Sequence, residues 1–467
     1  MLPSRRCSTY DPAEEPPPHD VLTTLFQDPV PAQAGDNFGG TTEVHPVGVA
    51  ALAMLMALTL LLPRRWSALP VCLLLCFIPA GQRIVIATVD FTFIRLLFGV
   101  VWLRVLVRSE WRPIVWNHLD RAMVLWGGVT IVSGTLMAGT LTVFVNRTGT
   151  VLDTLMVFFF FRQLIRSHED LLAVATQFLF CSFAVVVFFA IENRTHRNMF
   201  AMFGGVPAIT DIRDGRLRCQ GAFAHSILAG CFWACLIPLY WLRGWLRADW
   251  ILPVFGTITA IAIVGLCASS TPVMALAFGM VGLGAWFLRG ALRWYRWLIV
   301  AWLCVLHFIL MKMPVWHLLA RVDVVGGSTG WHRYHLVDKF FVFFEEWFLL
   351  GTMRTGHWGP GLHDVTNQFV AEGVNGGLAR LLVFCWIVYL AFAGISRSLR
   401  LPAAGRSYQL ASWALGTAMF MHCMNFIAVT YFEQIVVQWN LLLAAVSSLT
   451  LVPGAAPVRQ VAQLAPA

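Results

Sequence analysis

Residues 170–190 read DLLAVATQFLFCSFAVVVFFA, a run in which Asp170 is the only charged side chain. A helix of about 20 mostly apolar residues is long enough to cross the hydrocarbon core of a bilayer. Backbone N–H and C=O groups find no water there, so a crossing segment must satisfy them internally as a helix. The run therefore predicts a membrane-spanning helix.

Similar apolar runs recur along the chain. They cover residues 46–62, 67–81, 88–107, 119–138, 150–165, 225–242, 250–267, 272–288, 297–313, 377–395, 408–429 and 433–452. The first two are short for independent spans, so we expect twelve or thirteen transmembrane helices. The predicted fold class is all-α: a polytopic helical membrane protein with a large helical periplasmic loop towards its C-terminal side.

The composition of the 467 residues excludes a soluble globular protein. Hydrophobic residues make up 58% and charged residues only 12%, against about 25% charged in soluble domains. The net charge of +9 is almost all arginine, because Lys312 and Lys339 are the only lysines. Arginine clusters between alternate apolar runs are typical of cytoplasmic loops, so we expect no nucleic-acid partner. The 11 cysteines are scattered and show no metal-ligand spacing, so we interpret them as small core residues.

Five regions follow from this pattern. Residues 1–45 form a Pro-rich acidic tail that we expect to be disordered. We expect residues 46–313 to form an N-terminal transmembrane region and residues 314–376 to form a loop on the outer side that carries the candidate site residues. Residues 377–453 form the C-terminal transmembrane helices, and residues 454–467 form a second disordered tail.

The segment from Glu192 to His225 is unusual because it is rich in arginine, although the helix order places it on the outer side. Either its acidic residues Glu192, Asp211 and Asp214 neutralise some of these arginines, or the expected topology is off by one span there. The functional alternative is an anion site, because guanidinium groups bind phosphate oxygens in bidentate fashion. Arg218 is the best candidate, since it stands just before an apolar run.

A polar segment of about sixty residues, Val315 to Asn375, holds the other candidates. Arg333 opens an aromatic-rich stretch and could reach a phosphate at the interface, or pair with Asp338 or a neighbouring glutamate. His363 shares a helical face with Asn367 four residues on. A histidine in this setting is a candidate general base near neutral pH. The alternatives are a structural histidine or another base; the rival bases are Glu345, Glu346, His357 and Asp364.

These residues together resemble the O-antigen ligase and O-antigen polymerase superfamily. The likeness covers roughly residues 85–452 as an order of sparse motifs. They are Arg218-x-x-Gly221 before a span, Ser269 and Ser270 opening a later span, Arg333 in a large outer loop, and His363 followed by Asn367-Gln-Phe-Val-Ala-Glu372-Gly. Members of this superfamily are bacterial inner-membrane glycosyltransferases. In this chain His363 stands four residues before Asn367, whereas the family histidine often directly precedes the asparagine.

The resemblance implies transfer of a glycan from an undecaprenyl-pyrophosphate carrier to an acceptor hydroxyl at the periplasmic face, in surface polysaccharide biosynthesis. Arg218, Arg333 and Arg354 would bind the pyrophosphate, and His363 with Arg333 would act in catalysis. Asn367 and Glu372 would shape the loop. No metal or cofactor is implied. The expected partners are the lipid-linked donor, a glycan, lipid or protein acceptor, and membrane lipids.

Two other interpretations stay open at this stage. The chain could be a transporter or flippase of lipid-linked polysaccharide precursors, although transporters often show repeated halves and broken helices, and no clear repeat is visible. It could also be a non-catalytic family member, given the altered spacing between His363 and Asn367. Donor sugar, acceptor and oligomeric state cannot be inferred from these residues.

Overall fold

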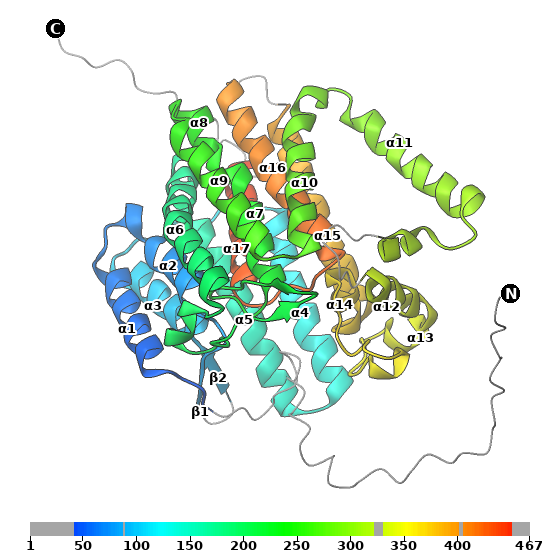
Figure 1. The fold of residues 1–467 in the computed structure, drawn as a ribbon, viewed down its shortest axis with the longest axis horizontal. Helices are drawn as coiled ribbons and strands as arrows, with labels where there is room; N and C mark the ends of the chain where they lie inside the picture. The colour runs from blue at the N-terminus through cyan, green and yellow to red at the C-terminus, as the bar shows by residue number, and fades with distance from the viewer. Residues whose placement is uncertain (1–41, 87–88, 322–329, 401–404, 451–467) are drawn as a thin grey trace, which may run out of the picture. The chain divides into compact units, whose positions relative to one another are not determined.

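The structure is a computed structural model that describes residues 42–86, 89–321, 330–400 and 405–450. The two predicted tails lie outside the described residues, apart from residues 42–45. Most of the described chain is helical (Figure 1). The helices are α1 (Pro46–Leu61), α2 (Leu69–Phe77), α3 (Phe93–Val107), α4 (His118–Ala138), α5 (Leu141–Leu164), α6 (His168–Thr195), α7 (Ser226–Tyr240), α8 (Leu242–Arg247), α9 (Ile251–Leu266), α10 (Ser270–Gly284), α11 (Leu292–Val305), α12 (Gly330–Val342), α13 (Phe344–Trp347), α14 (Gln368–Val374), α15 (Gly377–Ser398), α16 (Arg406–Phe426) and α17 (Gln434–Thr450).

The helical lengths bear out an all-α, polytopic membrane protein. Within the described ranges, six helices are long and apolar enough to cross a membrane: α4, α5, α6, α7 with α8, α10 with its following turn, and α15. A seventh is added if α11 and the bent segment after it form one span. Three shorter apolar helices, α1, α9 and α17, fall below that length. The expected span at residues 67–81 is represented by the much shorter α2.

Two small hairpins were not predicted. β1 (Arg83–Ile86) pairs antiparallel with β2 (Val89–Thr92), and β3 (Ile212–Arg213) pairs with β4 (Arg216–Leu217). The first replaces the start of the helix expected at 88–107. α3 begins only at Phe93, where the Thr92 hydroxyl caps it by accepting from the backbone N–H of Arg95 (3.2 Å). Apolar β-branched residues at 84–86 and 89 suit a strand as well as a helix, which explains the error.

α17 is one of the two most enclosed helices, together with α7. Nearly all of its residues from Gln434 to Leu449 are buried, and it packs against α5, α15 and α16. α11 is its opposite, because its main contact is with the turn that follows it, and it stands apart from the neighbouring helices in Figure 1. Large side chains such as Trp294, Trp297 and Trp302 are exposed on α11. In a bilayer, lipid tails would cover such faces.

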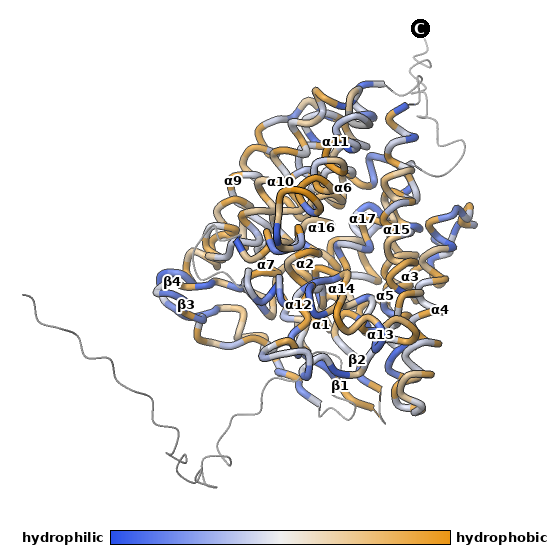
Figure 2. Tube along the Cα trace, turned by 90° about the vertical axis from the view of Figure 1, so that its right-hand side faces the viewer, coloured by the Kyte–Doolittle hydropathy of each residue, from blue (hydrophilic) through white to orange (hydrophobic). Residues whose placement is uncertain are grey.

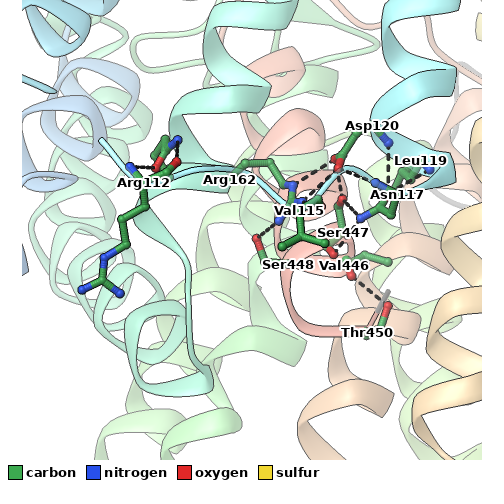
Figure 3. A network of polar contacts seen from close by, with 11 residues as sticks. Arg112, Val115, Asn117, Leu119, Asp120, Arg162, Val446, Ser447, Ser448 and Thr450 are labelled. Carbon is green, nitrogen blue, oxygen red and sulfur yellow. Dashed lines mark hydrogen bonds and ion pairs between the residues drawn. The ribbon is translucent and has the colours of Figure 1, made fainter. Parts of the chain in front are cut away.

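A buried ion pair joins α17 to α4 and α5 (Figure 3). Arg162 donates from Nε and Nη2 to the two carboxylate oxygens of Asp120, each at 2.9 Å, and Asp120 is fully buried. The hydroxyl of Ser447 donates to Asp120 (2.6 Å), and Arg162 Nη1 donates to Ser448 (2.9 Å). Arg162 stood in a predicted cytoplasmic arginine cluster. In the structure it is an internal connector of three helices.

Candidate functional site

The arginine-rich segment between α6 and α7 is folded around one carboxylate. Glu192, fully buried near the end of α6, accepts hydrogen bonds from the Thr210 hydroxyl (3.0 Å) and from the backbone N–H groups of Gln220 and Gly221 (both 3.1 Å). Glu192 therefore holds the segment in place. We had considered it as a group that neutralises arginine, but all its hydrogen bonds in the described chain come from uncharged donors.

Gly221 is required by this arrangement. Its φ is +59°, and a Cβ added there would lie 2.4 Å from the ring of Phe189. Its carbonyl oxygen accepts from the side chain of Asn198 (2.8 Å). The chain leading from Arg218 into α7 is thus fixed on both sides by buried hydrogen bonds.

The β3–β4 hairpin presents arginines in front of this segment. Its turn residues, Asp214 and Gly215, both have positive φ, as a tight two-residue hairpin demands. The turn places Arg213 directly opposite Arg216 in the register. Figure 2 shows the hairpin as a strongly hydrophilic feature. Arg218 follows at once, and its backbone N–H donates to the carbonyl of Asp211 (3.0 Å).

The guanidinium group of Arg218 is half-buried, and its buried Nε has no hydrogen-bond partner among the described residues. Burial lowers the pKa of Arg218, and the positive charge of Arg213 lowers it further, against the opposing effect of Asp211. A buried donor without a partner is costly unless something else accepts its hydrogen bond. Arg218 is therefore poised to donate to an anion.

Arg333 lies on α12 and is buried, with 7% exposure. It donates from Nη2 to the hydroxyl of Thr271 (3.0 Å) and from Nε to the carbonyl of Ala428 (3.1 Å). The salt bridge considered for Arg333, to Asp338 or a nearby glutamate, does not form, because no carboxylate in the described chain pairs with it. Burial lowers the pKa of Arg333, and Arg213 contributes in the same direction. Cys219, next to Arg218, donates its backbone N–H to the carbonyl of Leu266 (3.1 Å), five residues before Thr271, so Arg218 and Arg333 come from neighbouring segments.

Helix N-termini add to this positive region. Thr271, which accepts from Arg333, is in the first turn of α10, so the predicted helix start at Ser269 and Ser270 is confirmed. α7 packs on α10 near the same end, where a Cβ at Gly230 would lie 2.5 Å from the ring of Pro272. The unpaired N–H groups of a helix N-terminus carry about half a positive charge and favour anions. We call Arg213, Arg218, Arg333 and these two helix starts the guanidinium cluster.

His225 belongs to the same neighbourhood, although the sequence favoured a capping or packing role for it. It precedes α7 without capping it by its side chain, and its ring packs edge-on against Phe432 at 5.9 Å. Burial lowers the pKa of His225; the charge of Asp364 opposes this effect, and that of Arg218 adds to it. Asp364 belongs to the loop that carries His363.

His363 itself is exposed and makes no hydrogen bond or ion pair with any residue that the structure describes. The adjacent backbone is well fixed: His332 bonds to the carbonyl of Asp364 (3.1 Å), and Thr430 donates to that of Val365 (2.5 Å). Asn367 caps α14 by accepting from the N–H of Val370 (3.1 Å) and donates to Ile427 (3.0 Å). Asn367 thus positions the loop against the segment between α16 and α17.

Among the described residues, neither Glu372 nor Arg354 contacts a member of the guanidinium cluster. Glu372 is buried and accepts from Trp126 (2.9 Å) and Gln368 (2.8 Å), with Arg380 Nε at 2.8 Å, so it ties α14 to α4 and α15. Arg354 is exposed, and its side chain has no partner within the described ranges. The geometry therefore groups Arg218 with Arg333, while His363 and Arg354 are not brought into contact with them.

Among the rival bases, Glu346 is engaged by its own loop. It accepts from Thr352 (2.7 Å) and Trp358 (3.1 Å) and pairs with His357 (2.8 Å). Asp364, the residue after His363, is the rival base whose charge affects the pKa of His225. Arg213 was one of several arginines, and only the tight hairpin turn distinguishes it.

Comparison with known proteins adds no assignment: no family model matches this chain, and no curated protein is significantly similar to it. The structure so far defines a polytopic helical membrane protein in which Arg333 is buried and donates to neutral oxygens, with Arg218 half-buried on a neighbouring segment.

Proposed function

We propose that the protein is a membrane glycosyltransferase that moves a glycan from a polyprenyl-pyrophosphate carrier to an acceptor hydroxyl. The observation that carries this proposal is Arg333: a buried guanidinium that donates to two neutral oxygens and pairs with no carboxylate among the described residues. Maintaining such a charge costs stability, and an anionic ligand is the natural partner for it.

The guanidinium cluster suits the chemistry of such a transfer. When the anomeric C–O bond breaks, negative charge develops on the departing pyrophosphate. Fixed donors aimed at that charge stabilise the transition state without reorganising. Arg218 and Arg333 would hold the pyrophosphate, with Arg213 closing over it from the hairpin. The first turns of α7 and α10 would add backbone donors.

The setting in the membrane supports a lipid-linked substrate. The chain order brings the starts of α7, α10 and α17 to one end of the bundle, together with α12 and α14. We propose that this end faces the periplasm of a bacterial inner membrane and that the complete chain crosses it twelve or thirteen times. A carrier lipid could then keep its tail in the bilayer while its pyrophosphate reaches the cluster.

The acceptor side is less defined. Attack by a hydroxyl is assisted by a base within hydrogen-bond reach. His363 is the base predicted from the sequence, and its exposed ring lacks the orienting partner that catalytic histidines use.

The test is transfer by the purified protein in nanodiscs, with an undecaprenyl-pyrophosphate-linked oligosaccharide as donor. Arg333→Ala should lose transfer and should bind farnesyl pyrophosphate at least tenfold more weakly in calorimetric titration. Arg194→Ala, an exposed arginine on the same segment as Arg218, is the matched control and should behave as wild type. Equal binding by both variants would contradict the proposal. Movement of intact donor between leaflets without transfer would favour a flippase.

A further inference from the structure

Glu433, in the segment between α16 and α17, has an unusual backbone. Its φ is +58°, in the left-handed region that favours glycine. A non-glycine residue held there costs free energy, and it persists only where the surrounding structure fixes it. Such strain at a carboxylate directs attention to what the side chain does.

The two neighbours of Glu433 tie it to the guanidinium cluster. The ring of Phe432 packs against His225, and the side chain of Gln434 donates to the carbonyl of Ala222 (2.8 Å). Arg218 stands four residues before Ala222. The backbone on both sides of Glu433 therefore lies against the segment that leads from Arg218 into α7.

The surroundings of the carboxylate are glycine-lined. A Cβ added at Gly81 would lie 3.9 Å from Glu433 Oε1 and 3.1 Å from the carbonyl of Gly205. Within the described chain the side chain makes no hydrogen bond or ion pair. Burial raises the pKa of Glu433 to about 7. The ionisable groups on the elements packed here are His225, His45 beside Gly204, and Arg83, which faces Glu43 at 3.9 Å.

We propose that Glu433 is the general base of the transfer and faces the acceptor sugar, an inference that rests on the proposed function. The Glu433 carboxylate takes the proton of the acceptor hydroxyl, whose oxygen forms the new bond to the anomeric carbon. The bond from that carbon to the pyrophosphate oxygen breaks, and its electron pair leaves with the pyrophosphate. Arg218 and Arg333 stabilise that departing charge, and Glu433 then returns its proton to water.

Glu433→Gly separates this role from a structural one. Glycine adopts positive φ at no cost, so the variant should unfold at the same temperature as wild type or higher. Removal of a general base typically slows a reaction by about 10²–10⁴-fold. We therefore expect transfer in nanodiscs to fall at least 100-fold, with farnesyl pyrophosphate binding within twofold of wild type. Glu433→Gln, which keeps the shape of the side chain, should be equally slow.

The outcomes are distinguishable. If wild type transfers glycan and Glu433→Gly does so at the same rate, the assignment of Glu433 falls and the proposed function stands. If Glu433→Gly loses pyrophosphate binding together with thermal stability, Glu433 is structural and the inference is wrong. If wild type binds the pyrophosphate but transfers nothing, both proposals fall.

Discussion

At the scale of single residues, the molecule places charge where it costs stability. Arg333 is buried against neutral oxygens, and Glu433 combines a strained backbone with an unpartnered carboxylate. Neither feature helps folding, and both lie at the end of the bundle where Arg218 is held. Residues that lower stability are expected where they serve function, so we expect Arg333 and Glu433 to have functional roles.

Arg333→Met should therefore make the protein inactive without making it less stable. Methionine removes an uncompensated buried charge and keeps much of the side-chain volume. We expect transfer to fall at least 100-fold and the unfolding temperature in detergent to stay equal or rise. A clear drop in unfolding temperature would mean that the bonds to Thr271 and Ala428 are the main role of Arg333.

Glu433 should make stability depend on pH. Its folded-state pKa of about 7 lies above the ordinary value, so the folded protein holds this proton more tightly than the unfolded chain. That contribution is present at low pH and is lost as the pH rises through 7. Glu433→Gln stays neutral, so its gain in unfolding temperature over wild type should be larger at pH 8 than at pH 5. If the difference in unfolding temperature between Glu433→Gln and wild type does not change with pH, this prediction is wrong.

At the scale of elements, the segment between α6 and α7 illustrates what can be read from sequence. The bounds of apolar helices were close: residues 119–138 were expected for α4 and 377–395 for α15. The β1–β2 hairpin was missed because its short apolar stretch fits either structure. The path of the chain from Arg218 into α7 depends on Glu192 and Gly221, whose contacts come from distant parts of the chain and leave no local pattern.

Glu192→Ala should release that segment. It leaves three buried donors, on Thr210, Gln220 and Gly221, without their acceptor, at about 1–3 kcal/mol for each donor that finds no water. We expect a lower unfolding temperature and weaker farnesyl pyrophosphate binding. Glu169→Ala on the same helix is the control, because its pair with Arg247 is exposed and should contribute little. If the two substitutions lower the unfolding temperature and the binding equally, Glu192 does not hold the segment in place.

At the scale of the whole bundle, the buried pair of Asp120 and Arg162 connects three helices (Figure 3). The hydropathy pattern predicts a cytoplasmic end for the apolar run that carries Arg162. It does not predict the partners of Arg162, because Ser447 lies far away in the chain. Membrane proteins keep such groups inside, paired and hydrogen-bonded. The number of membrane spans and the geometry of the site also depend on contacts between residues far apart in the chain, so they could not be predicted from the sequence.

Asp120→Ala should be among the most destabilising changes, by about 3–5 kcal/mol, because it leaves a buried guanidinium unpaired. Asp120→Leu combined with Arg162→Met should recover most of that loss. Chemical unfolding in detergent micelles measures both. If the double variant is no more stable than Asp120→Ala, the remaining bonds of Arg162 to Ser448 and Val115 carry the connection.

The enclosed position of α17 has a consequence for biosynthesis. α17 follows α4, α5, α15 and α16 in the chain, so the ribosome delivers it after the helices that surround it. Those earlier helices enter the bilayer before Ser447 and Ser448 exist to satisfy Asp120 and Arg162. Lipid or the insertion machinery must occupy the centre of the bundle until then, and α17 displaces it on arrival.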